Sequence, residues 1–422
     1  MPVNPFDMTP GKNAELFVDW ARMWPQPYDK HTVDPYTRTR VILMNGTEFE
    51  NVWYSHQFSR HTLDNDLRRQ LALLRRSEQQ QQKMLCHLKP ADETVLEHTI
   101  GYEQLAVDLT AHLAKRVTDA GIKKALDFAL LEDFDHLYRY ADLLEMQDHV
   151  KAEDLVGHYT EIMPGRPTIA HHRHPYDSIR FPMTQCDAPT MDVLAAGVIT
   201  AAEQQTMNYY MNVAATYPEE KGRKLYEEIG MVEEQHVSQY GSLINPKLTW
   251  LENLLVHQYT ECWLYWSCHE TETVPHIKQV WAFMFEQELM HLHTAESLLK
   301  KYENKQWQQV IPDGEFPQPL RLESNIPYVR GVLGASVNKT AQRESYVDVD
   351  TLPQGNTFAE YQKQVNEPMK NVMSHVVIED YIRKNGQDYR FETAPNPIPE
   401  LQDRKKDNTQ VGRMPEKVLQ KV

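Results

Sequence analysis

The chain has 422 residues, of which 41% are hydrophobic and 25% are charged, and its 44 Lys and Arg against 60 Asp and Glu give a formal net charge of −16. This length suffices for two or three domains, or for one large domain with a substantial core. The acidic balance argues against nucleic acid or an anionic membrane surface as the main partner, because both reward clustered Lys and Arg.

Residues 1–60 contain scattered prolines and aromatic residues, and we expect them to form an extended arm on the main body, with a short strand at 41–45. The N-terminus has no basic segment followed by an apolar one, and no apolar run is long enough to span a membrane. The four cysteines include no CxxC pair, so they predict neither a disulfide scaffold nor a Cys-rich zinc site. We therefore expect a cytoplasmic protein without a membrane span.

Residues 61–304 form the predicted helical domain, because apolar residues recur there with the period of an amphipathic helix. Prolines and capping residues divide it into expected helices over about 63–88, 94–117, 122–147, 190–216, 219–243, 248–268 and 275–302.

Two segments break this pattern. Residues 150–189 contain five prolines and the sequence His-His-Arg-His at 171–174, which predicts a long irregular connection. Its histidines are interpreted as an exposed loop, a lid over a site, or a weak surface metal binder. Residues 305–422 predict an irregular C-terminal extension with helices at 358–370 and 372–384 and a charged tail at 401–422.

An internal repeat links two of the expected helix pairs. A shift of 100 residues aligns a Glu on the first helix of each pair, and 30 residues later an acid followed at i+3 by His. These residues are Glu103, Asp133 and His136 in the first pair and Glu203, Glu233 and His236 in the second. Positions i and i+3 share a helix face, and the equal spacing sets the three side chains of each pair at one height. Such convergence is what a metal ion requires of its ligands.

The acid–His pairs also lie inside the apolar stripes of their helices. A carboxylate in such a stripe is costly unless it is paired or bound to metal. The chain contains three acid-x-x-His pairs, about the number that chance predicts, so the motif alone carries no weight. The argument depends on the stripe, the matched Glu, the equal spacing and the long connection. Two hairpins with buried His–acid pairs and no metal remain the alternative.

This order of ligands resembles the ferritin-like di-iron carboxylate superfamily, which includes rubrerythrins and oxidase or oxygenase subunits. The resemblance covers about residues 92–245 and implies an all-α fold with a four-helix bundle and a long crossover. It implies that Glu103, His136, Glu203, Glu233 and His236 bind two iron ions per chain, with manganese as an alternative.

The first hairpin departs from the family pattern. Asp133 stands where a Glu is expected, and Glu132 precedes it directly, so either residue could supply that ligand.

The third hairpin, residues 248–302, carries Glu261, Glu288 and His291. Its carboxylates are 27 residues apart, and the connection at 244–249 is too short to run the length of a helix. We expect this hairpin to pack outside the metal bundle and treat its three residues as a second-choice metal site.

The predicted activity is that of a di-metal oxidoreductase that activates O₂ or peroxide, with electrons from a small-molecule substrate or an external donor. No glycine-rich nucleotide loop is present. The alternatives are a non-catalytic metal-binding or helical scaffold protein, and a hydrolase that uses the same carboxylates with zinc or magnesium. The terminal extensions could form a substrate pocket or a homodimer interface. Five tyrosines near the ligands are interpreted as core residues or as hydrogen-bonding neighbours of the metals: Tyr102, Tyr140, Tyr209, Tyr210 and Tyr240.

Overall fold

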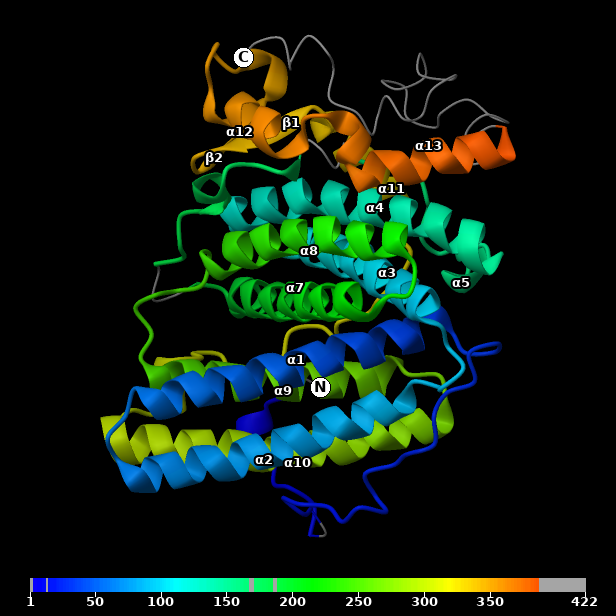
Figure 1. Ribbon diagram of the computed structural model, residues 1–422. Coiled ribbons are helices and arrows are strands. Elements are labelled where there is room, and N and C mark those ends of the chain that lie inside the picture. Colours follow the sequence, from blue (N-terminus) through cyan, green and yellow to red (C-terminus); the bar gives the residue numbers. More distant parts are fainter. Residues whose placement is uncertain (1–2, 13, 167–170, 185–187, 387–422) are drawn as a thin grey trace. The chain divides into compact units, whose positions relative to one another are not determined.

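The computed structural model describes residues 3–12, 14–166, 171–184 and 188–386, which are mainly α-helical (Figure 1). The all-α prediction is confirmed. Among the described residues, the only strands are β1 (Lys339–Gln342) and β2 (Ser345–Asp348), which pair antiparallel. No described helix combines the length and the apolar character that crossing a bilayer requires.

The chain divides into two compact units, each assembled from separate stretches of sequence. Unit 1 comprises Met1–Glu93, Pro182–Gln205 and Ile244–Leu322, and unit 2 comprises Thr94–Phe181, Thr206–Leu243 and Glu323–Val422. The division falls within the continuous helix α7 (Thr190–Thr216), which therefore belongs to both units.

Unit 1 contains a bundle of two helical hairpins. Its helices are α1 (Pro35–Arg60), α2 (Asn65–Leu88), α9 (Trp250–Thr271) and α10 (Pro275–Glu303). The α1–α2 hairpin packs on the α9–α10 hairpin, with α1 against α9 and α2 against α10 (Figure 1). The 248–302 hairpin, which the sequence predicted to pack outside the metal bundle, is one half of this bundle of α1, α2, α9 and α10.

Helix α1 replaces the extended arm and the short strand expected within residues 1–60. The carboxylate of Asp34 caps it by accepting from the backbone N–H of Tyr36, and Pro35 occupies the first turn, where its missing N–H costs nothing. Every residue from Tyr36 to Met44 is buried. A helical segment buried on all sides lacks the alternation of polar and apolar faces, so periodicity could not reveal this first part of α1.

Unit 2 contains a second bundle, formed by α3 (Val95–Ala114), α4 (Ala120–Asp148), α8 (Glu220–Gly241) and the later part of α7. Thr94 and Glu97 form a reciprocal capping box that fixes the start of α3. One apolar cluster joins these four helices, with Val107, Leu130, Tyr210 and Ile229 among its fully buried members.

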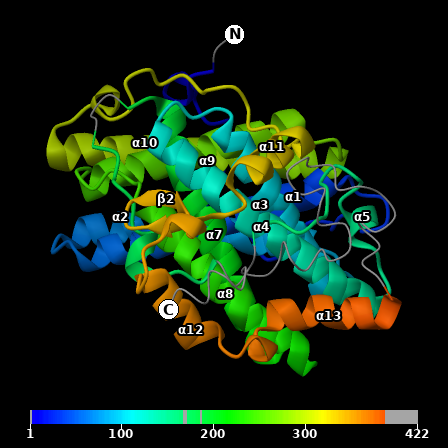
Figure 2. The same cartoon turned by 90° about the horizontal axis from the view of Figure 1, so that it is seen from above.

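The C-terminal part of unit 2 covers its bundle. It contains α11 (Ile326–Ser336), α12 (Thr357–Asn366) and α13 (Met373–Asn385), and α13 packs across α4 and α8 (Figure 2). The two helices predicted within 358–384 are confirmed, whereas α11 was not expected. The predicted charged tail at 401–422 lies outside the described residues.

Short helical segments complete the described structure: α5 (Ala152–Leu155), η1 (Pro5–Asp7), η2 (Pro175–Ser178), η3 (Trp307–Gln309), η4 (Val349–Thr351) and η5 (Met369–Asn371).

Candidate metal centre

The predicted ligands lie on α3, α4, α7 and α8, and Glu203 lies on the part of α7 that is grouped with unit 1. Glu103 is on α3, Asp133 and His136 are on α4, Glu203 is on α7, and Glu233 and His236 are on α8. Each of the six side chains is at most 1% exposed. The helical spacing of three residues places each acid on the same face as its His, as the sequence predicted.

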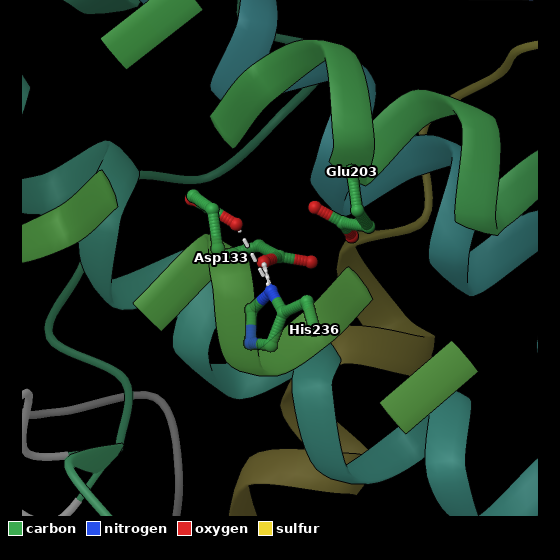
Figure 3. A group of neighbouring side chains, drawn as sticks. Asp133, Glu203 and His236 are labelled. Carbon is green, nitrogen blue, oxygen red and sulfur yellow. Dashed lines mark hydrogen bonds and ion pairs between the residues drawn. The ribbon is translucent and has the colours of Figure 1, made fainter. Parts of the chain in front are cut away.

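The ligand atoms form two groups, within each of which all atoms lie within 4.8 Å of one another. The first group is Asp133, Glu203, Glu233 and His236, and the second is Glu103, His136 and Glu233. The labelled side chains of the first group point toward one another in Figure 3. Because Glu233 belongs to both groups, the geometry contains two adjacent positions that share one carboxylate.

The two imidazoles face the shared carboxylate with the same ring nitrogen. Nδ1 of His136 lies 3.0 Å from Oε1 of Glu233, and Nδ1 of His236 lies 3.0 Å from Oε2. Nδ1 of His236 is also 3.2 Å from Oδ1 of Asp133. Burial opposes ionisation of Glu233, but the imidazoles outweigh burial and lower its pKa. The pKa of Asp133 is raised, chiefly by burial.

Glu132 has a different environment from Asp133. Its carboxylate accepts from Nη1 of Arg173 at 3.2 and 3.1 Å, lies 3.5 Å from Nη1 of Arg166, and lies 2.6 Å from Nε2 of His236. Burial alone would raise the pKa of Glu132, but Arg173 and the nearby histidines hold it well below its usual range. Of the two residues that the sequence left open, Asp133 lies in a ligand group, and Glu132 lies on the other side of the His236 ring.

The His-His-Arg-His segment is not the exposed loop favoured from the sequence. His171 and Arg173 are fully buried, and His172 is 5% exposed. The His171 ring lies against that of His136, with centroids 5.7 Å apart. This segment supplies the counter-charge for Glu132, a role that periodicity could not reveal because Arg173 lies outside any helix.

Tyrosines line the bundle close to the carboxylates. The hydroxyl of Tyr210 donates to Oε1 of Glu103. The Tyr102 and Tyr209 rings stack with centroids 4.5 Å apart. The centroids of the Tyr240 and His236 rings are 6.2 Å apart. Tyr210 is thus a hydrogen-bonding neighbour of a predicted ligand, whereas stacking explains the burial of Tyr102 against Tyr209.

The charges at this site fit a divalent metal. Neither Asp133 nor Glu233 forms an ion pair with Lys or Arg among the described residues, and both oxygens of Asp133 are buried without a hydrogen-bond partner. Other acids of the same unit are neutralised by arginine, for example Asp135 by Arg139 at 3.0 Å. Among the described residues, histidine is the one basic partner of these two carboxylates, and a divalent cation bound between them would replace the protons of the imidazoles. Carboxylate and imidazole ligands suit iron or manganese.

Comparison with known proteins adds no relative: no protein-family model, no curated protein and no solved structure matches this chain. The fold and the site therefore define a helical protein with buried carboxylate and histidine clusters that could bind metal.

Proposed function

We propose that the carboxylate and histidine cluster on α3, α4, α7 and α8 holds two iron ions, or manganese, and that the protein is a di-metal carboxylate oxidoreductase. The observation that carries this proposal is the shared carboxylate of Glu233, which has one histidine Nδ1 at each oxygen. The same inventory of carboxylates and two Glu/Asp-x-x-His pairs is typical of ferritin-like di-metal bundles.

Each position would have its own ligand set. Glu103 and His136 would hold one ion, Asp133, Glu203 and His236 the other, and Glu233 would bind both. Bound iron supplies reversible one-electron redox at each position, which suits two-electron oxidation by O₂ or peroxide.

The surrounding residues would orient these ligands. With metal bound, the Nε2–H of His236 would donate a hydrogen bond to Glu132, and the lone pair of Nδ1 would then face the carboxylates. Arg173 keeps Glu132 ionised, and the hydroxyl of Tyr210 holds Glu103. Complete burial of these side chains excludes bulk water and strengthens each electrostatic contact.

The test is anaerobic reconstitution of the full-length protein with Fe(II), followed by measurement of iron per chain and of O₂ consumption. We expect Glu233→Gln to lose about two iron ions per chain and the O₂ consumption that depends on them. The matched control is Glu234→Gln, because Glu234 is the adjacent, exposed residue of α8.

Each outcome decides the proposal. Equal iron content in Glu233→Gln and Glu234→Gln excludes this site. Iron lost in Glu233→Gln without any change in O₂ consumption leaves a metal-binding protein and overturns the oxidoreductase. Hydrolytic activity that requires Zn(II) or Mg(II), without O₂ consumption in the presence of Fe(II), identifies the protein as a hydrolase instead.

A further inference from the structure

The unit 1 bundle contains its own buried cluster of carboxylates and histidine. Glu48 lies on α1, Glu78 on α2, Glu261 on α9, and Glu288 and His291 on α10. Each of the five side chains is at most 1% exposed. The sequence had singled out only the three residues of the α9–α10 hairpin.

The cluster repeats the layout of unit 2. Glu48 and Glu78 are 30 residues apart, as are the paired acids of the α3–α4 and α7–α8 hairpins, and Glu288 is followed at i+3 by His291. Position i+3 after Glu78 is Gln81 rather than His. Each bundle thus has two hairpins with one Glu on the first helix and an acid with a polar i+3 partner on the second.

The ligand atoms again form two groups with a shared member. Glu78, Glu288 and His291 form one group and Glu48, Glu78 and Glu261 form the other, each with all ligand atoms within 4.8 Å of one another. Glu78 therefore belongs to both groups of this cluster, as Glu233 belongs to both groups of the other cluster.

Each carboxylate is held by one oxygen and unsatisfied at the other. The amide of Asn51 donates to Glu78 at 3.0 Å and to Glu261 at 2.6 Å, and the hydroxyl of Tyr265 donates to Glu48. The remaining oxygens are buried without a hydrogen-bond partner: Oε2 of Glu48, Oε2 of Glu78, Oε1 of Glu261 and Oε2 of Glu288. Neutral donors thus fix the orientation of these groups, and burial, followed by the neighbouring carboxylates, raises the pKa of Glu48 and Glu261.

Gln81 provides an independent sign of a missing ligand. Its Nε2 donates to Oε1 of Glu288 at 2.5 Å, while its amide oxygen is fully buried and has no hydrogen-bond partner. Buried polar atoms are nearly always satisfied, so an unsatisfied oxygen beside the carboxylates indicates a group that the protein itself does not supply.

Other buried acids of unit 1 pair with arginine, unlike the four carboxylates of this cluster. Buried Glu93 pairs with Arg38, and buried Glu272 pairs with Arg40, each at 3.2 Å. Among the described residues, no Lys or Arg pairs with Glu48, Glu78, Glu261 or Glu288, and His291 is the one basic group beside them. Unit 1 therefore supplies arginine where a buried acid is structural and omits it at this cluster.

A cavity of about 240 Å³ reaches the cluster. Glu261 and Asn51 form part of its wall, together with Val198, Ala201, Val256 and Thr260. A metal site needs an entry path, and this cavity offers one.

We propose that unit 1 is a second divalent-metal centre, with Glu78 shared between two positions and Gln81 in place of the second histidine. His291 serves one position, and the other is surrounded only by oxygen donors. Oxygen ligation favours Mn(II), Fe(II) or Mg(II) over Zn(II) or Cu(II). This inference concerns different residues from those proposed in unit 2 and does not depend on the activity proposed there.

The chain offers a spectroscopic readout for this unit alone. All eight tryptophans lie in unit 1, so tryptophan fluorescence follows the unfolding of unit 1. A metal that binds only the folded state raises the midpoint of that transition. For a unit of this size, Mn(II) at 100 times its Kd should raise the midpoint by about 5–10 °C.

The experiment compares full-length wild type with Glu78→Gln, Glu233→Gln and the double variant. After loading with Mn(II) or Fe(II) and desalting, Glu78→Gln should lose about two ions per chain and the shift in fluorescence midpoint. Glu233→Gln should lose about two other ions and keep the shift, and the double variant should bind almost none. Glu270→Gln, at the exposed end of α9, is the control and should match wild type.

Further variants keep the test decisive. Because Glu261→Gln removes a carboxylate from the same cluster, it should repeat the result if Glu78→Gln folds poorly. Gln81→His should tighten Mn(II) binding in unit 1. The inference is overturned if Mn(II) leaves the wild-type fluorescence midpoint unchanged, or if Glu78→Gln retains the metal content of Glu270→Gln. Failure of the unit 2 proposal alone has a separate signature, in which Glu233→Gln loses no metal while Glu78→Gln does.

Discussion

The contact between Glu132 and Arg173 gives the sharpest prediction about unit 2. Both side chains are fully buried, and Arg173 meets both carboxylate oxygens. Replacing Glu132 with Leu leaves Arg173 and Arg166 without their shared counter-charge. We expect Glu132→Leu to destabilise metal-free unit 2 strongly, because an uncompensated buried charge is more costly than the loss of an ordinary contact.

The magnitude follows from the geometry. Two unit charges about 4 Å apart interact by about 4 kcal/mol at the effective dielectric constant of about 20 that suits such sites. Removal of one partner from a buried pair typically costs about 3–5 kcal/mol, and we expect this loss for Glu132→Leu. Arg166 keeps other partners, since it donates to the carbonyl of Phe128 and, at 3.2 Å, to that of Ser336. Glu132→Leu combined with Arg173→Met should therefore recover about half of the loss or more.

The assay is urea unfolding in EDTA, followed by far-UV circular dichroism and by tryptophan fluorescence. The fluorescence transition should be the same in all variants, because the tryptophans lie in unit 1. With metal present, Glu132→Leu should also weaken binding in unit 2 by about 10–100-fold, since His236 loses the partner that orients it. The reasoning is refuted if Glu132→Leu is as stable as wild type, or if the double variant is as unstable as the sum of the two single variants.

Two further predictions test unit 2 away from its metal ligands. Burial, together with Arg116, lowers the pKa of His112 to about 4. Below pH 6.5 the imidazole of His112 therefore binds a proton in the unfolded chain but stays neutral in the folded chain. This difference should lower the free energy of unfolding by about 2 kcal/mol at pH 5 relative to pH 8. His112→Asn should remove that part of the pH dependence in urea titrations, and an unchanged slope between pH 5 and 8 contradicts it. A Cβ on Gly165 would lie 2.5 Å from the carbonyl oxygen of Leu131, whereas one on Gly331 of α11 meets nothing within 4 Å. Gly165→Ala should cost about 1–3 kcal/mol and Gly331→Ala should gain about 0.5–1 kcal/mol, and equal melting temperatures for the two would disprove the packing argument.

Local signals in the sequence were sufficient for most helix boundaries. The expected helix at 190–216 coincides with α7, and the capping residue Thr94 marks the start of α3. Those signals depend on neighbours within a few residues, which any chain segment carries with it. Helix α1 was not predicted, because its burial depends on the surrounding helices rather than on a periodic pattern in its own sequence.

The candidate ligands of unit 2 were also accessible from the sequence, because helix geometry fixes which residues share a face. The cluster of unit 1 was only partly accessible. Glu48 was assigned to an extended arm, and Gln81 broke the acid-x-x-His pattern that would have drawn attention to Glu78.

Periodicity along single elements was enough to predict most of the helices and the acid–His faces, because both depend on residues within one helix. The tertiary structure alone decided which hairpins pair: the first with the last in unit 1, and the two middle ones in unit 2. Each hairpin has a similar polar face, so no local signal identifies its partner and only the packed core selects it. It also separated two neighbouring acids, because Arg173 from the irregular connection compensates Glu132, whereas Asp133 lies in a group that could bind metal.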